Sequence, residues 1–190
     1  MRADFGFRVP RAPRHRLFDV ELGGGGILDV GGYPVSFARL LAGVVENAPF
    51  AEPTSVDAIG HVGPTGADEL ASAFLRFASG FTAETSCAVH HAVGRSAVVF
   101  GELGHIVLPD PWIPGGDRQG RDTGFWIHRD GAEPERVRVH TPAATYAIEA
   151  ELVAATLPAV EAPWPAMTWA DTLGNMRVLD TWRARLREKI

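Results

Sequence analysis

With 190 residues, of which 46% are hydrophobic and 22% charged, the chain is expected to form a single globular domain with a hydrophobic core. Its net charge of −5 argues against nucleic acid or an anionic membrane as the main partner, and no apolar run approaches the roughly 18 residues that span a bilayer. One cysteine excludes an internal disulfide and fits a reducing compartment, and no secretory signal opens the sequence, so we expect a cytoplasmic protein.

The N-terminal part of the sequence predicts a strand, a loop and a helix. Residues 3–8 alternate as a strand does, and segment 10–16 is typical of a loop rich in proline and arginine. We expect its arginines to be solvated, although one of them could instead face an anionic group on a cofactor or partner. These are Arg11, Arg14 and Arg16. A helix is expected over residues 34–41, with Gly43 as its stop signal.

The middle of the chain predicts antiparallel strands. After a strand at 55–62 and a polar turn at 63–68, the clearest hairpin pairs 69–77 with 81–90. Both of its faces are only partly apolar, which is typical of a sheet with helices on one side and a partner surface on the other. Further strands are expected at 96–100, 105–108, 125–129 and 135–140, separated by a proline-rich break at 109–116 and a charged, mobile segment at 117–122.

Two helices are expected to close the chain. The first covers residues 144–157 and is built from strong helix formers. The second covers residues 169–187, and its apolar residues recur at helical spacing. We expect this stripe to pack into the core. Its members are Leu173, Met176, Leu179, Trp182 and Leu186.

The stretch from Gly23 to Leu41 contains the most informative pattern. Four glycines, at 23–26, allow a backbone free of side chains that a ligand or another segment can approach closely. Asp29 and Tyr33 would share a face if the backbone were helical between them. Pro34 disfavours that conformation for Tyr33, so we expect a turn carrying Asp29 and then a helix beginning at Pro34. The residues alone also allow Asp29 to be a helix cap and Tyr33 a core residue.

This pattern, Gly-Gly-Gly-x-x-x-Asp-x-Gly-x-Tyr-Pro over residues 23–34, resembles the signature that opens the second domain of the glucose–fructose oxidoreductase/inositol dehydrogenase family (Gfo/Idh/MocA). The tyrosine is similar to that of the branch with dihydrodiol and sugar dehydrogenases. Residues 2–7, 101–106 and 167–171 resemble the domain's first strand, late hairpin and last helix start. The resemblance implies an α+β fold: an open, mostly antiparallel sheet with helices on one face, the other face being free for oligomer contact.

The resemblance also implies a function. In the family, the group at the position of Tyr33 exchanges the proton of a substrate hydroxyl during hydride transfer, and the aspartate at the position of Asp29 orients the substrate or supports that group. The chain would then be the substrate-binding and catalytic half of an NAD(P)-dependent oxidoreductase acting on a sugar, polyol or diol. Because a free phenol has a pKa near 10, such a tyrosine needs nearby positive charge, which a helix N-terminus supplies in part.

Two expected parts of such an enzyme are missing from the sequence. The family carries a catalytic lysine in a Glu-Lys-Pro segment, which does not occur here, and Lys189 cannot be mapped onto it. The glycines fail the dinucleotide fingerprint, because its third glycine would fall at Leu28 or Asp29. We therefore interpret the chain as a single C-terminal domain, residues 1–190, without the Rossmann domain. NAD or NADP belongs to the full-length family, and the isolated chain is expected to bind neither and to be inactive.

Other chemistries have weaker support. His90 and His91 are expected to point to opposite faces of a strand, and no histidine pair has the spacing of a zinc site. Cys87 is expected to be a buried small residue. Two hypotheses therefore remain. One is the catalytic half, with a small polyhydroxy substrate and a homodimer formed through the sheet face. The other is a non-catalytic module that dimerises or binds a sugar-like ligand.

Overall fold

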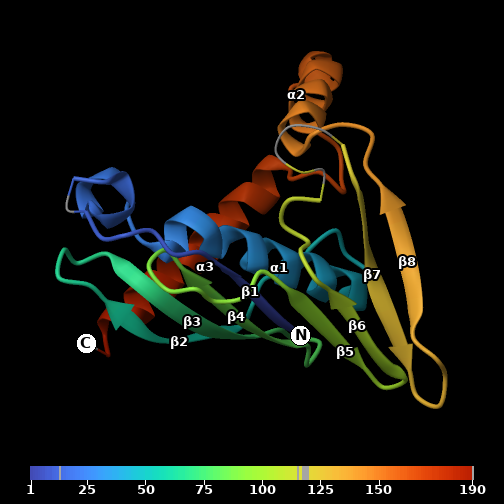
Figure 1. Cartoon of the computed structure of the whole chain (residues 1–190), viewed down its shortest axis with the longest axis horizontal. Coiled ribbons are helices and arrows are strands. Elements are labelled where there is room, and N and C mark those ends of the chain that lie inside the picture. The colour runs from blue at the N-terminus through green and yellow to red at the C-terminus, as the bar shows by residue number, and fades with distance from the viewer. Residues whose placement is uncertain (13, 115, 117–119, 190) are drawn as a thin grey trace. The chain divides into compact units, whose positions relative to one another are not determined.

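The computed structural model describes residues 1–12, 14–114, 116 and 120–189, which form two compact units (Figure 1). The first unit contains residues 1–95 and those from 170 onward; the second contains residues 96–169. The prediction of a single domain stays a prediction. The first unit holds β1 (Arg2–Gly6), α1 (Gly32–Glu46), β2 (Ser55–Val62), β3 (Asp68–Arg76), β4 (Thr82–Ala88) and most of α3 (Trp169–Arg187). The second holds β5 (Ala97–Gly101), β6 (Gly104–Leu108), β7 (Asp122–Arg129), β8 (Glu135–His140) and α2 (Thr145–Thr156).

The strands of the first unit lie in the order β2-β3-β4-β1. β2 pairs with β3 and β3 with β4 in antiparallel fashion, as the hairpin pattern predicted, whereas β1 joins β4 in parallel. The register places Ser72 opposite Ser86, and their hydroxyl oxygens are 2.8 Å apart. The same alternation turns Cys87 toward the other face, where it is fully buried, as predicted.

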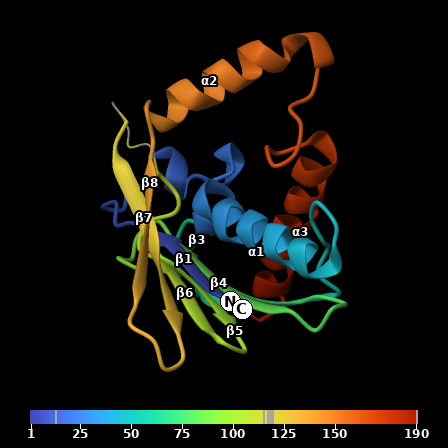
Figure 2. The ribbon, with the colours of Figure 1, turned by 90° about the vertical axis from the view of Figure 1, so that its right-hand side faces the viewer.

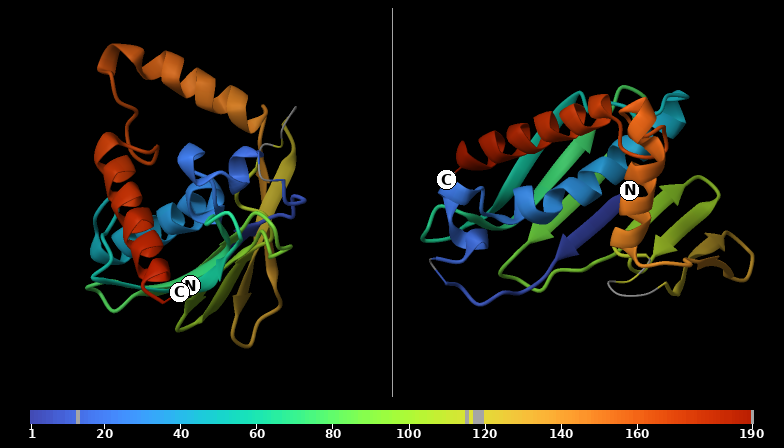
Figure 3. Two further views of the ribbon diagram at one scale, coloured as in Figure 1. Left: turned by 90° about the vertical axis from the view of Figure 1, so that its left-hand side faces the viewer. Right: turned by 90° about the horizontal axis from the view of Figure 1, so that it is seen from above.

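Helices α1 and α3 lie on the same face of these strands (Figures 2 and 3). Small residues let them approach closely, since a side chain at Gly31 of the turn before α1 would meet Trp182 of α3 and Cys87. The buried strand residues on this face are Ala3, Phe5, Val56, Ala58, Ala71, Ala73, Leu75, Ala83, Thr85 and Cys87. The predicted α+β fold, with mostly antiparallel strands and helices on one face, is therefore confirmed.

The helix that carries the sequence pattern begins earlier and ends later than predicted. A π-helical turn, Ile27–Gly31, leads directly into α1, so the expected start at Pro34 was wrong. Gly43 does not stop the helix but lies buried inside it against the backbone of Phe50. Asn47 ends it in the left-handed conformation, with φ of 55°.

The helical stretch Val20–Glu46, with 27 residues, is long and apolar enough to cross a membrane by length and composition alone. By length and composition, the expectation that no stretch could span a bilayer was therefore wrong. Half of its most apolar part is buried inside the protein, however, and Arg39 of the same stretch is fully buried in an ion pair. Core helices of globular proteins can be equally long and apolar, and a partly buried stretch with a buried ion pair is typical of a core helix.

The stripe on α3 packs into the core only in part. Leu179, Trp182 and Leu186 are buried, as predicted. Leu173 and Met176, at the beginning of the helix, are 57% and 42% exposed, so the prediction was wrong for them. The buried half of the stripe packs over the strands, since a side chain at Gly60 of β2 would touch Leu186.

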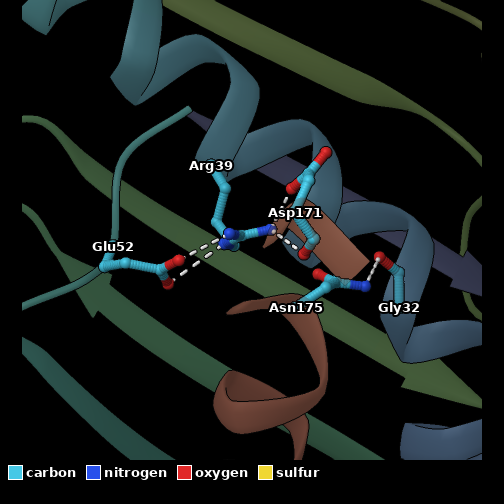
Figure 4. A network of polar contacts seen from close by, with 5 residues as sticks. All are labelled: Gly32, Arg39, Glu52, Asp171 and Asn175. Atoms are coloured by element: carbon cyan, nitrogen blue, oxygen red, sulfur yellow. Dashed lines mark hydrogen bonds and ion pairs between the residues drawn. The ribbon is translucent and has the colours of Figure 1, made fainter. Parts of the chain in front are cut away.

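Arg39 joins α1 to two other segments (Figure 4). Its guanidinium is fully buried and donates two hydrogen bonds to Glu52, with Nη2 to Oε1 at 2.6 Å and Nε to Oε2 at 3.2 Å. It also donates to the backbone oxygen of Asp171, at 2.9 Å, and to the carboxylate of the same residue. The ring of Phe50 lies 4.7 Å from the guanidinium carbon. This network ties α1 to the connector before β2 and to the first turn of α3.

In the second unit, β5, β6, β7 and β8 form an antiparallel meander. Its strands agree with the prediction, except that β7 begins three residues earlier, at Asp122. The expected mobile segment at 117–122 lies partly outside the described residues. Helix α2 forms where predicted, but none of its residues is buried.

We expect Arg39→Met to lower the free energy of unfolding by about 3 kcal/mol, because it leaves the Asp171 carboxylate without its buried cation. Urea unfolding would measure the loss. Glu52→Gln is the matched control: the Glu52 side chain is 47% exposed, so its loss should cost less than about 1 kcal/mol. Equal losses in the two variants would contradict the structural role given to Arg39.

Candidate active site

The glycine-rich turn is built around the carboxylate of Asp68, the first residue of β3. Oδ2 of Asp68 accepts a hydrogen bond from the backbone N–H of Ile27 at 2.7 Å. A side chain at Gly25, where φ is 117°, would collide with this carboxylate. The acid thus stabilises the positive N-terminal end of the helical segment, a role that local cap residues usually fill. At least part of the glycine run is therefore needed for this contact.

Burial raises the pKa of Asp68 to about 6. The hydrogen bond from Ile27 opposes this rise, as does, more weakly, the positive charge of Arg183. Cys87 lies in the same region: burial, and next the charge of Asp68, raise the pKa of its thiol. This cysteine is therefore held in the neutral form, which is a poor nucleophile.

Asp29 lies in the π turn and is held by an arginine from the N-terminal loop. Nη1 of Arg16 donates to Oδ1 of Asp29 at 2.7 Å. The Asp29 side chain is only 14% exposed, whereas that of Arg16 is 67% exposed. The carboxylate is therefore oriented by a partner that itself faces solvent.

The loop arginines are all exposed, as expected, but two of them also bind carboxylates of the chain itself. Arg11 forms a two-pronged ion pair with the buried Glu69, with both nitrogen–oxygen distances at 2.6 Å. The hydrogen bonds from Arg11 lower the pKa of that carboxyl. Arg16 binds Asp29, and Arg14 is exposed, as expected. The anionic groups that these arginines face belong to the chain itself.

Tyr33 is the second residue of α1 and is 47% exposed. Its ring meets that of Phe5 from β1 edge to face, with the centroids 5.0 Å apart. Phe5 is buried, and the guanidinium of Arg95 lies 5.4 Å from its ring centroid. The phenol ring is thus supported by the core and yet reachable from solvent.

Asp29 and Tyr33 lie one turn apart on a continuous helical segment, Ile27–Glu46. The backbone between them is helical, which is the condition for the two side chains to share a face, so the expected non-helical turn at Asp29 was wrong. Sequence reasoning missed Phe5 and Arg95 as neighbours of this site, because no motif marks them. Arg16 was among the arginines singled out, but its partner could not be named from the sequence.

Within the described part of the chain, no three histidine, cysteine or acidic side chains are grouped as metal ligands. His90 and His91 follow β4, which ends at Ala88, so the expectation that they alternate across a strand was wrong. Their rings meet edge to face, with centroids 5.5 Å apart. Nδ1 of His90 lies 2.8 Å from the backbone oxygen of Val9, so this nitrogen has a protein partner.

Residues 1–107, more than half of the chain, match the family model described as the GFO/IDH/MocA C-terminal domain. The chain belongs to the GFO/IDH/MocA family. An uncharacterised oxidoreductase of Rhizobium meliloti is 32% identical over 173 residues, covering 88% of this chain and 48% of that protein. The trans-1,2-dihydrobenzene-1,2-diol dehydrogenase of Xenopus tropicalis is 35% identical over 115 residues, covering 60% of this chain and 32% of that enzyme. The predicted family is thus confirmed.

Solved structures of GFO/IDH/MocA-type oxidoreductases share the fold. The aldose-aldose oxidoreductase of Caulobacter crescentus, complexed with glycerol, superposes with a TM-score of 0.76 at 22% identity and covers 100% of this chain and 53% of its own. A 3-ketoreductase from Actinomadura kijaniata, in complex with NADP and TDP-benzene, superposes with a TM-score of 0.73 at 20% identity. The match covers 97% of this chain and 53% of that protein. The chain thus spans about half the length of these structures, and half or less of its curated relatives.

The raised pKa of Asp68 predicts a pH dependence of stability. Because the folded pKa lies above the unfolded value of 3.8, the stabilisation is complete below 3.8 and is lost as the pH rises through about 6. Over this range the free energy of unfolding of the wild type should fall by about 3 kcal/mol relative to that of Asp68→Asn, whose amide does not titrate. Urea unfolding between about pH 3 and pH 7.5 would measure it. Parallel pH profiles for the two proteins would contradict the expectation.

Proposed function

We propose that this chain supplies the substrate-binding and catalytic half of an NAD(P)-dependent oxidoreductase acting on a hydroxyl group of a sugar, polyol or diol. The observation that carries the proposal is the half-exposed phenol of Tyr33, one helical turn after Asp29. The relatives support the substrate class, because they include diol dehydrogenases and an aldose oxidoreductase complexed with glycerol.

In this proposal, Tyr33 exchanges the proton of the substrate hydroxyl. The phenolate oxygen accepts the proton as the hydroxyl becomes a carbonyl, and the phenol returns it in the reverse direction. The ring contact with Phe5 fixes the phenol. The phenolate, which is the form able to act as a base, therefore needs positive charge from a group other than the helix N-terminus, because that end is already occupied by Asp68.

Asp29 is assigned to orienting the substrate. Arg16 binds Oδ1 of its carboxylate, so Oδ2 is the oxygen that we assign to a substrate hydroxyl. A carboxylate that is mostly buried and held at one oxygen loses little freedom when it binds a ligand at the other. A small polyhydroxy compound offers adjacent hydroxyl groups, one for Tyr33 and one for Asp29.

The glycine-rich turn does not fit the pyrophosphate of NAD or NADP. Its backbone N–H at Ile27 already donates to Asp68, and a phosphate there would meet that carboxylate at close range. We therefore assign only the proton transfer and substrate binding to this chain. The hydride acceptor belongs to the part of the longer relatives that this chain does not match, and the chain alone is proposed to be inactive.

The second proposal is a non-catalytic module that dimerises through its sheet or binds a sugar-like ligand. The face of the first unit opposite the helices exposes Ile59 on β2 and Phe74 on β3, which are 58% and 50% accessible. In the second unit, a groove of about 500 Å³ is lined by apolar residues that include Phe100 and Leu103. Both proposals are compatible with a homodimer through the sheet face, and they differ in whether Tyr33 performs chemistry.

Catalysis is tested by mixing the chain with the separately produced remainder of the Rhizobium meliloti relative, and following NAD(P)H absorbance with sugars, polyols and diols. Tyr33→Phe should lower turnover by at least 100-fold, because it removes the group that exchanges the proton. Tyr146→Phe is the matched control, since this tyrosine lies in α2, and it should keep full activity.

The same assay separates the two proposals. The chain without its added half should show no turnover and no quenching or enhancement of NAD(P)H fluorescence. Activity of the chain alone would overturn the assignment of the cofactor to the other half. Turnover in the mixture that survives Tyr33→Phe would overturn the role of this tyrosine, and a mixture inactive with every substrate would favour the non-catalytic module.

Dimerisation is tested by sedimentation of the chain. Phe74→Glu should convert a dimer to a monomer, because it replaces an exposed ring of this face with a third negative charge beside Asp57 and Glu84. Val45→Glu, at a 54% exposed position on α1, should leave the dimer intact. A dimer that survives Phe74→Glu, or a monomer at all concentrations in the wild type, would contradict the sheet-face dimer.

A further inference from the structure

The charge of Asp29 poses a problem for the proposed role of Tyr33. A carboxylate one helical turn from a phenol opposes the phenolate form, since like charges raise the pKa of the group that must ionise. The only lysine is Lys189, next to the C-terminal residue. Positive charge near Tyr33 must therefore come from arginines or from outside the chain.

We propose that Arg16 is a positioning residue of this site, which orients Asp29 and offsets its negative charge beside Tyr33. Its place in catalysis rests on the proposed function, whereas its electrostatic effect on the phenol does not. The contact that carries the inference is the 2.7 Å ion pair between Nη1 of Arg16 and Oδ1 of Asp29. When this ion pair is formed, the charges of Arg16 and Asp29 nearly cancel at the position of Tyr33.

The backbone under Arg16 is held firmly, which distinguishes this pair from an ordinary surface ion pair. The next two residues, Leu17 and Phe18, are buried. The backbone oxygen of Leu17 accepts a hydrogen bond from Gly25 at 3.0 Å, which joins this loop to the glycine-rich turn. Earlier in the loop, Arg11 is anchored to the buried Glu69. The guanidinium of Arg16 is therefore held beside Asp29 by a loop that is anchored on both sides of Arg16.

The other charged groups around the site form a background that the substitutions below leave unchanged. Arg95 lies over the ring of Phe5, on which Tyr33 rests. Asp68 lies beneath the turn that carries Asp29, with Arg183 acting on it from α3. Because these groups stay in place, a change in the pKa of Tyr33 can be attributed to the Arg16–Asp29 pair.

The sequence makes this inference directly measurable, because the chain has only two tyrosines, Tyr33 and Tyr146. In a Tyr146→Phe background, the absorbance of tyrosinate between pH 8 and 11 reports Tyr33 alone. Arg16→Gln should raise the pKa of Tyr33 by about half a pH unit, the size expected for unit charges several ångströms apart in a water-like medium. Asp29→Asn should lower it by a similar amount. The double variant should return close to the parent value, and Arg16→Lys should restore it.

Arg14→Gln is the matched control, because it removes the same charge from an exposed position in the same loop. It should leave the pKa of Tyr33 within about a tenth of a unit. Circular dichroism would check that each variant is folded. If Arg16→Gln does not fold, the pKa of Tyr33 in Asp29→Asn and in Arg16→Lys still tests the inference. An unchanged pKa in Arg16→Gln, or in Asp29→Asn, would overturn the inference. Failure of the proposed function would appear separately, as activity that persists in Tyr33→Phe.

Discussion

The structure around the candidate site depends on one buried hydrogen bond, from the N–H of Ile27 to the carboxylate of Asp68. It joins the beginning of the helical segment to the beginning of β3, and so fixes the helix relative to the strands beneath it. Burying a carboxylate is costly unless hydrogen bonds and positive charge compensate for it. Here the helix N-terminus and Arg183 compensate for part of this cost. The pKa of Asp68 is still raised, so part of the cost of burying its charge is not compensated.

Arg39 provides the second fixed point on the same helix. Its ion pairs with Glu52 and Asp171 lie about two turns after Tyr33. Replacing a buried ion pair with apolar residues is often neutral for stability, so such a pair is better understood as specifying one arrangement of segments. With Asp68 at its start and Arg39 further along, the helix can neither slide nor rotate without leaving a buried charge unpaired. The direction in which Tyr33 projects is set by these two residues.

The sequence predicted the strands well and the helix boundaries poorly, for a physical reason. Strand pairs such as β3 and β4 are encoded locally, by alternation and a short connection, and these appear in any window of the sequence. The start of the helical segment is set by Asp68, which is 41 residues away from Ile27. No local pattern around Pro34 contains that information. The partners of Arg16 and Tyr33 escaped prediction in the same way, because ion pairs and ring contacts between distant segments exist only after folding. The glycine run and the Asp–Tyr spacing were visible because the signature itself is local.

The glycine-rich turn shows why such a motif must be interpreted through the groups that its backbone meets. Glycines before a helix are typical of phosphate sites, because exposed N–H groups and the helix end attract an anion. In this chain the anion is internal, supplied by Asp68, so the turn is complete without a ligand. The attractive end of the helix is thus used for folding, while Tyr33, further along the same helical segment, remains half exposed. In the proposed function, that division leaves Tyr33, rather than the glycines, as the group that acts on a substrate.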